Sequence, residues 1–126
     1  MTSDRVEVVQ RMIEAFRVGD LDAALATVHQ KLVVHEAASL PYGGEWTGPD
    51  GFRDLLHHLG DHGLEVLASE IFDAGDEVVV RFDTRFTSPR SGAVIPMPIV
   101  EVYRFADGLI SDIDIFYKDT KALIDL

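Results

Sequence analysis

The sequence predicts an α+β fold in which a curved, mostly antiparallel sheet packs on N-terminal helices. Two observations predict this class. Apolar residues recur at helical spacing in the first part of the chain, and at alternating positions through most of the second half. The chain has 126 residues, 47% of them apolar, which suits a single domain spanning 1–126 with a substantial core. A strongly bent sheet folded over a long helix would enclose a cone-shaped interior.

The first third of the chain predicts two helices and a strand. Apolar residues repeat every three or four positions over 4–18, which predicts a helix that Gly19 ends. Asp20 is suited to capping a second, short helix that continues to Val28. The largely apolar run at 32–37 then predicts the first strand.

A loop and a third helix are expected next. Residues 38–47 contain one proline and two glycines, which is typical of a loop. Gly48-Pro49-Asp50 is typical of a helix start, because a proline in the first turn has no N–H to leave unpaired. We expect this helix to run to about residue 59 and to end in the glycine-rich stretch at 60–63.

Four strands are expected after the third helix. Alternating apolar and polar residues predict a strand with one buried face most clearly over 77–87. The dipeptide Asp107-Gly108 is a strong hairpin signal between the last two strands. The expected strands cover 64–72, 77–87, 95–105 and 109–118, and a last helical turn is expected within 119–126.

Charge and composition exclude several classes of partner and site. The formal net charge is −11, from 22 acidic and 11 basic residues, and no two basic residues are adjacent. Because phosphate binding depends on clustered cations, we expect neither nucleic acid nor an anionic membrane as a partner. The chain has no cysteine, which excludes disulfides and thiolate chemistry and is compatible with the cytoplasm, where we place the protein. No apolar stretch approaches the roughly 18 residues that a membrane span needs.

Several segments follow one another in an informative order and spacing. They are Val8-Val9-Gln10-Arg11, Gly19-Asp20-Leu21-Asp22, Val33-Val34-His35-Glu36, the loop at 40–48, and the strand segments at 80–86 and 101–105. In this order the chain resembles the ketosteroid isomerases, and its loop is similar to that of SnoaL-like proteins, relatives of the polyketide cyclases. The resemblance covers nearly the whole chain. It implies the nuclear transport factor 2-like fold, a cone-shaped, cystatin-like α+β barrel.

The resemblance also implies roles for individual residues. The general-base aspartate of the isomerases falls on Glu36, and their protonated aspartic acid, which donates to the oxyanion, falls on Glu101. Their oxyanion tyrosine falls on Met12, which cannot donate a hydrogen bond. The His and Asp pair of the polyketide cyclases has no clear match in the segment 111–115. No cofactor is implied.

Two carboxyls in an apolar cone favour proton-transfer chemistry. Desolvation raises the pKa of a buried carboxyl, and repulsion between two of them leaves one protonated. Glu36 would then take a proton next to a carbonyl, while Glu101 or Tyr42 polarises that carbonyl by donating a hydrogen bond. The alternative is that one or both lie at the edge of the cone, solvated or paired with arginine. His35 is the other candidate for catalysis, but neighbours on a strand face opposite sides, and we expect Glu36 to face inward.

The expected pocket is lined mainly by apolar and aromatic side chains. Tyr42 and Trp46 lie in the loop near its mouth, where they either cover a ligand or plug the core beneath the third helix. His58 and His62 are spaced as in a helical metal site, but no acid completes a motif, and we expect no metal. The expected ligand-binding residues are Met12, Phe16, Tyr42, Trp46, Phe52, Phe82, Phe86, Tyr103, Ile115 and Tyr117.

Three functions remain open at this point. The first is a cofactor-independent isomerase, cyclase or dehydratase acting on a small hydrophobic carbonyl compound. The second is a non-catalytic domain that binds a small apolar molecule, and the third is a dimeric interaction module with a vestigial pocket. Relatives of this fold pair through the outer face of the sheet, so the resemblance implies a homodimer. Fold alone decides none of these functions.

Overall fold

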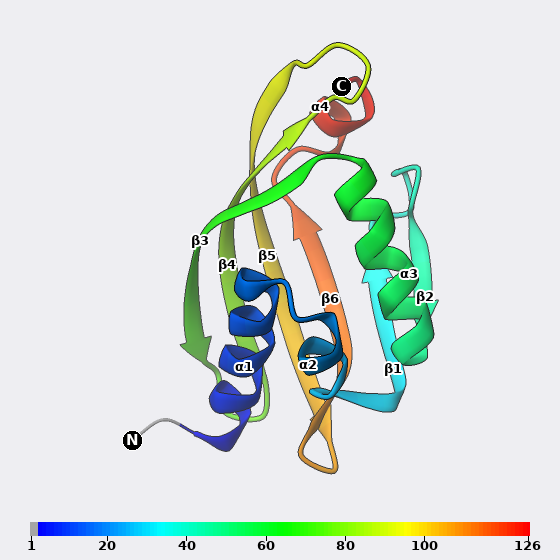
Figure 1. The fold of residues 1–126 in the computed structure, drawn as a ribbon. Helices are drawn as coiled ribbons and strands as arrows, with labels where there is room; N and C mark the ends of the chain where they lie inside the picture. Colours follow the sequence, from blue (N-terminus) through cyan, green and yellow to red (C-terminus); the bar gives the residue numbers. More distant parts are fainter. Residues whose placement is uncertain (1–2) are drawn as a thin grey trace.

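The computed structural model describes residues 3–126. In it, helices pack on one face of a curved sheet (Figure 1). Helices α1, α2 and α3 lie on that face, and α4 follows the last strand near the C-terminus. The elements in chain order are α1 (Asp4–Val18), α2 (Leu21–Leu25), β1 (Val28–Glu36), β2 (Gly44–Thr47), α3 (Gly48–Asp61), β3 (Leu64–Asp73), β4 (Val78–Thr87), β5 (Val94–Ala106), β6 (Leu109–Tyr117) and α4 (Thr120–Ile124).

The first helix has the bounds that its sequence predicts. The side chain of Ser3 accepts a hydrogen bond from the Val6 N–H at 3.2 Å and caps the start of α1. Gly19 ends the helix with a φ of 75°, which a residue with a side chain rarely adopts. The buried residues of α1 lie on one face of the helix, turned toward the sheet, and include Met12.

All strands belong to one sheet with the order β2-β1-β6-β5-β4-β3. Strand β1 pairs in parallel with β6, and the other neighbouring strands pair antiparallel. The predicted α+β class and the mostly antiparallel sheet are therefore confirmed. The two edge strands, β2 and β3, do not pair with each other, so the sheet curves without closing into the expected barrel.

The structure corrects the prediction between residues 20 and 47. Helix α2 ends at Leu25 and does not continue to Val28, because Val28 already pairs with Ile110 of β6. The first strand therefore starts four residues earlier than predicted. The expected loop over 38–47 contains β2, a short strand that pairs with the end of β1 and carries too few residues to show an alternating pattern.

The core fills the space between the helices and the inner face of the sheet. Strand β4 shows the alternation that its sequence predicts, with every second side chain buried from Val78 to Phe86. Strands β5 and β6 add buried apolar residues to the same face, among them Met97, Ile99 and Ile113. No helix described over residues 3–126 is long and apolar enough to cross a membrane.

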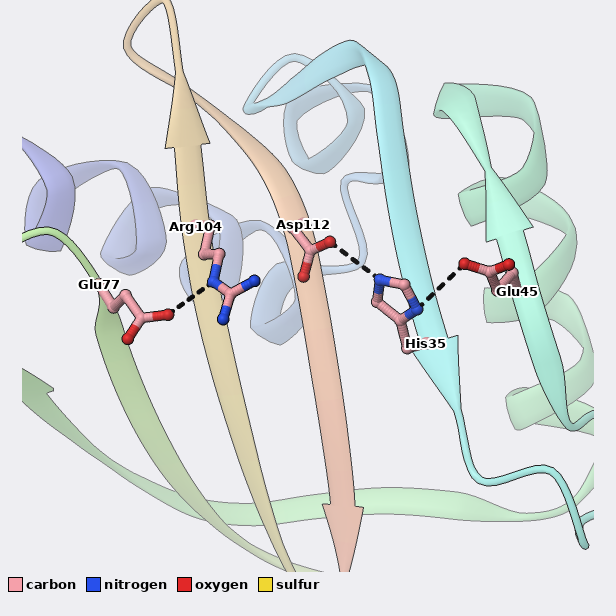
Figure 2. Close-up of polar contacts among 5 residues, drawn as sticks. All are labelled: His35, Glu45, Glu77, Arg104 and Asp112. Carbon is pink, nitrogen blue, oxygen red and sulfur yellow. Dashed lines mark hydrogen bonds and ion pairs between the residues drawn. The ribbon is translucent and has the colours of Figure 1, made fainter.

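The outer face of the sheet carries charged side chains on several strands and two exposed phenylalanines. An ion pair joins Arg85 of β4 to Glu65 of β3 at 2.8 Å. Figure 2 shows another, between Arg104 of β5 and Glu77, just before β4, at 2.7 Å. Such pairs are exposed and contribute little stability each, about 0–1 kcal/mol. On the same face, Phe72 near the end of edge strand β3 and Phe116 of β6 are exposed, by 45% and 53% of their surface.

Candidate functional site

A cavity of about 550 Å³ opens between α1, α3 and the inner face of the sheet. Its floor comes from strands β4, β5 and β6, and one side of its mouth comes from edge strand β3. Most of the lining is apolar, so the cavity suits a ligand with an apolar body. The lining residues are Met12, Ile13, Phe16, Arg17, Phe52, Leu55, Leu56, Leu59, Gly60, Leu64, Val66, Leu67, Ala68, Ser69, Phe82, Thr84, Ile99, Glu101, Ile113 and Ile115.

Glu101 is the acidic side chain in the cavity wall. It lies in β5 opposite Val80 of β4 and Ile115 of β6, which places it on the inner face of the sheet. The hydroxyl of Tyr103 donates a hydrogen bond to its Oε1 at 2.5 Å. Burial raises the pKa of Glu101 from 4.5 to about 7, and the hydrogen bond from Tyr103 opposes that rise. Glu101 therefore titrates close to neutral pH.

Glu36 is the second carboxyl of the interior and lies at the end of β1, with only 6% of its surface exposed. Tyr117 donates a hydrogen bond to its Oε1 at 2.8 Å. Because that hydroxyl proton is used, the oxygen of Tyr117 accepts from the hydroxyl of Tyr42 at 3.1 Å. The other carboxyl oxygen, Oε2, is buried and has no partner among the described residues. Such an atom is costly to bury, and in native structures it is often explained by function.

Burial raises the pKa of Glu36 from 4.5 to about 8. The hydrogen bond from Tyr117 lowers this pKa, and the nearby charge of Glu101 raises it further. The charge of Glu101 therefore acts on the ionisation of Glu36. Glu36 is not among the residues that line the cavity. It follows His35, which pairs with Asp114 of β6, and Ile115, the next residue of β6, is part of the floor.

His35 points away from the interior, as strand alternation predicts. Figure 2 shows its ring between Asp112 of β6 and Glu45 of β2, on the outer face of the sheet. Its Nε2 lies 2.9 Å from the Asp112 carboxyl, and its Nδ1 lies 3.2 Å from that of Glu45. His35 therefore bridges three strands on the face opposite the cavity and cannot act on a molecule inside it.

The structure divides the expected ligand-binding residues into two sets. Met12, Phe16, Phe52, Phe82 and Ile115 line the cavity. The others lie outside its lining: Tyr42, Trp46, Phe86, Tyr103 and Tyr117.

The residues outside the lining have other contacts. Tyr117 donates a hydrogen bond to Glu36 and in turn contacts the hydroxyl of Tyr42. Tyr103 donates to Glu101, and Phe86 is fully buried in the core.

Tyr42 and Trp46 stabilise the loop between β1 and β2 and do not cover the mouth of the cavity. The Trp46 indole N–H donates to the Tyr42 carbonyl oxygen at 2.9 Å, and its ring lies against His58 of α3. Gly43, between them, has no room for a Cβ, which would collide with the backbone oxygens of Ala37 and Ala38. Among residues 3–126, no group of three or more acidic, histidine or cysteine side chains could hold a metal ion.

The sequence did not identify most of the mouth of the cavity. Val66, Leu67, Ala68 and Ser69 of β3 form one side of it, where a bulge shifts the pairing with β4 between Val66 and Ala68. A bulge turns consecutive side chains to unexpected sides of a strand. An alternating pattern cannot reveal it, because the bulge itself interrupts the alternation.

Comparison with known families and structures places the chain among proteins of the same fold. The model of the SnoaL-like domain family matches residues 9–113. No curated protein matches significantly.

Among solved structures, an NTF2-like protein of unknown function from Burkholderia pseudomallei K96243 is 25% identical with a TM-score of 0.87, covering 99% of this chain and 98% of that one. A structure of TerC, co-crystallised with polyporic acid, is 24% identical with a TM-score of 0.86, covering 98% and 100%. A candidate SnoaL-like polyketide cyclase from Mesorhizobium loti is 21% identical with a TM-score of 0.71, covering 93% and 100%.

Proposed function

The chain belongs to the SnoaL-like domain family, and on that premise we propose that its cavity binds a small, mostly apolar molecule whose polar group meets Glu101. The observation that carries this proposal is the cavity itself, about 550 Å³ in volume, with a mainly apolar lining and one carboxyl on its floor. A cavity of this kind, with few polar groups among apolar ones, is the usual form of a small-molecule site.

The carboxyl pair also supports acid–base chemistry on the bound molecule. An ionised carboxyl can take a proton from a carbon next to a carbonyl, while a protonated one donates a hydrogen bond or returns the proton. Its position favours Glu101 as the base, the reverse of the assignment implied by the resemblance. Glu101 lines the cavity and Glu36 does not, so Glu101 is the carboxyl that a bound molecule meets. Burial raises the pKa of both carboxyls, and repulsion between them favours a state in which one keeps its proton.

Two structural neighbours are consistent with this proposal. TerC was crystallised with polyporic acid, and the protein from Mesorhizobium loti is a candidate polyketide cyclase. At 24% and 21% identity, these neighbours support the fold, and the residues of the present cavity carry the argument.

Hydrogen–deuterium exchange tests the chemistry without knowledge of the natural substrate. We suggest incubating the protein with 2-tetralone, an apolar ketone, in D₂O and following loss of the α-proton signals by NMR. The expected result is exchange faster than in buffer, abolished by Glu101→Gln and reduced by Glu36→Gln. Loss of exchange only in Glu36→Gln would restore Glu36 as the base. The His35→Gln variant is a control on the opposite face of the sheet and should exchange like the wild type.

The alternative is a domain that binds a ligand and performs no chemistry on it. The apolar dye N-phenyl-1-naphthylamine tests binding alone, because its fluorescence rises in an apolar site. Leu56→Trp places a larger side chain in the cavity and should remove saturable binding, whereas Ile124→Trp, on the exposed side of α4, should retain it. Dye binding without exchange of any ketone would favour the alternative, and absence of dye binding in the wild type would contradict the proposed cavity function.

A further inference from the structure

We propose that the ligand of this cavity is an apolar amine, bound as its ammonium ion against Glu101. The inference rests on the proposed function only in that the cavity accepts an apolar molecule. It adds the charge of that molecule, which neither the family nor the fold specifies. Three features of the described residues carry it: carboxyls without cations, aromatic rings in the lining, and a strongly acidic protein around the cavity.

The interior carboxyls have no basic partner. Over residues 3–126, neither Glu36 nor Glu101 lies within ion-pair distance of a lysine, arginine or histidine. Their hydrogen-bond partners are the tyrosine hydroxyls of Tyr117 and Tyr103, which are neutral. A buried carboxylate usually has a paired cation, and here none is supplied by the described part of the chain. An ammonium ligand would supply it.

Aromatic rings complete the chemistry of an ammonium site. Phe16, Phe52 and Phe82 line the cavity together with Glu101, and the rings of Phe16 and Phe52 meet edge to face with centroids 6.1 Å apart. The face of an aromatic ring attracts a cation, by about 2 kcal/mol or more where water is excluded. A cavity lined by a carboxyl and by phenylalanine rings therefore offers an ammonium ion both a counter-charge and favourable walls.

The one cation in the described lining does not oppose this proposal. Arg17 lies at the mouth, where its side chain is largely exposed, and it is already paired with Glu14 through two hydrogen bonds at 2.8 and 2.5 Å. Its charge is neutralised there and screened by water. The protein as a whole carries a formal charge of −11, which raises the local concentration of cations and lowers that of anions.

Binding of an ammonium ion should also release protons. Burial holds the pKa of Glu101 at about 7 and that of Glu36 at about 8, so both carboxyls are partly protonated near neutral pH. A positive charge beside a carboxyl lowers its pKa and favours the ionised form. Amine binding at pH 7 should therefore expel protons into the buffer, whereas a neutral ligand of the same shape should not.

Three naphthalene compounds of matched shape test the charge of the ligand. They are 1-naphthylmethylamine, 1-naphthalenemethanol and 1-naphthaleneacetate, which at pH 7 carry a positive, a zero and a negative charge. Dissociation constants are measured by isothermal titration calorimetry in two buffers of different ionisation enthalpy, so that proton release is measured with the affinity. The amine is expected to bind about tenfold or more tightly than the alcohol, with proton release, and the carboxylate is expected to bind least.

Variants then assign the preference to the cavity. Glu101→Gln keeps the shape of the side chain and should reduce the preference for amine over alcohol to about twofold or less, without loss of alcohol binding. Glu7→Gln removes one negative charge from the exposed side of α1 and should leave the preference unchanged, which separates the cavity carboxyl from net charge. Thermal unfolding by circular dichroism identifies a variant that fails to fold, and Glu36→Gln then serves as the second interior variant.

The outcomes separate this inference from the proposed function. If the alcohol binds as tightly as the amine, or the amine binds without proton release, the charge inference is wrong while the apolar cavity function holds. If the preference survives in a folded Glu101→Gln variant, or in Glu36→Gln where Glu101→Gln fails to fold, the inference is likewise wrong. If none of the three compounds binds and N-phenyl-1-naphthylamine does not bind either, the cavity function fails together with the inference.

Discussion

Replacement of Glu36 by glutamine should reveal the cost of its buried carboxyl as a change in how stability depends on pH. In the folded protein, burial raises the pKa of Glu36 to about 8 from the ordinary value of 4.5. Below pH 4.5 the side chain is protonated in both states and adds no pH dependence. Between pH 4.5 and about 8 the unfolded chain ionises while the folded one stays protonated, so the stability falls as the pH rises. Above pH 8 the loss is complete.

The size of this effect follows from the pKa. Each pH unit between the unfolded and folded pKa values removes about 1.4 kcal/mol, so a pKa raised from 4.5 to about 8 corresponds to about 5 kcal/mol across the window. Glutamine has the same shape and no charge, and its carbonyl oxygen can still accept from Tyr117. Its amide N–H groups add a constant cost of about 1–3 kcal/mol if they find no partner. That cost is the same at every pH, so the slope alone reports the carboxyl.

Urea unfolding of the wild type and Glu36→Gln at pH 5, 7 and 9, followed by far-UV circular dichroism, measures the difference directly. Relative to the wild type, the variant should gain about 3–5 kcal/mol between pH 5 and pH 9. Glu7→Gln, an exposed carboxyl on α1, is the matched control and should show a nearly constant difference. A difference between Glu36→Gln and the wild type that does not change with pH would refute the reasoning, because it would mean that Glu36 ionises as readily in the folded as in the unfolded state.

Three further predictions concern the hydrogen bond from Tyr117 to Glu36, the side chain of His35, and the outer face of the sheet. Tyr117→Phe removes the hydrogen bond that lowers the pKa of Glu36, so this pKa should rise above 8 when followed by ¹³C NMR of the glutamate carboxyls; an unchanged or lower pKa would contradict the contact. His35→Gln should cost about 0–1 kcal/mol and leave ligand binding unchanged, since the ring is partly exposed on the face opposite the cavity; weaker dye binding would contradict this. The homodimer implied by the resemblance stays a prediction. Because Phe72 and Phe116 are exposed on the outer face, sedimentation should give a dimer for the wild type and a monomer for Phe116→Glu, and a monomeric wild type would refute it.

Much of the fold could be predicted because its elements are long and strongly patterned. Alternation over β4 and the Asp107-Gly108 turn determine the last strands to within one residue at either end. On β1, alternation likewise places Glu36 on the inner face, since Val34, two residues earlier, is buried there as well. Strand β2 could not be predicted, because its four residues, the first of them a glycine, are too few to show an alternation of apolar and polar side chains.

The cavity wall was harder to predict for a physical reason. Whether an aromatic residue lines a cavity or fills the core depends on how the helices sit on the sheet, and all such residues share the same sequence pattern. Phe82 and Phe86 are both buried on β4, but only Phe82 lines the cavity. Likewise, Tyr117 supports Glu36 through a hydrogen bond across strands, a contact between residues 81 positions apart that no local pattern contains.

The cost of the interior carboxyls is itself an argument that the cavity is a site. An apolar side chain of similar volume in place of Glu36 would avoid both the raised pKa and the unpartnered Oε2. The ion-paired acids of the described chain lie at or near the surface, where water and basic side chains lower their cost. The two carboxyls of the interior have neither aid and lie close enough for the charge of Glu101 to act on Glu36, and Glu101 is part of the cavity wall. A purely structural core gains nothing from that arrangement, whereas a pocket that binds a polar or charged group recovers the cost when its ligand enters.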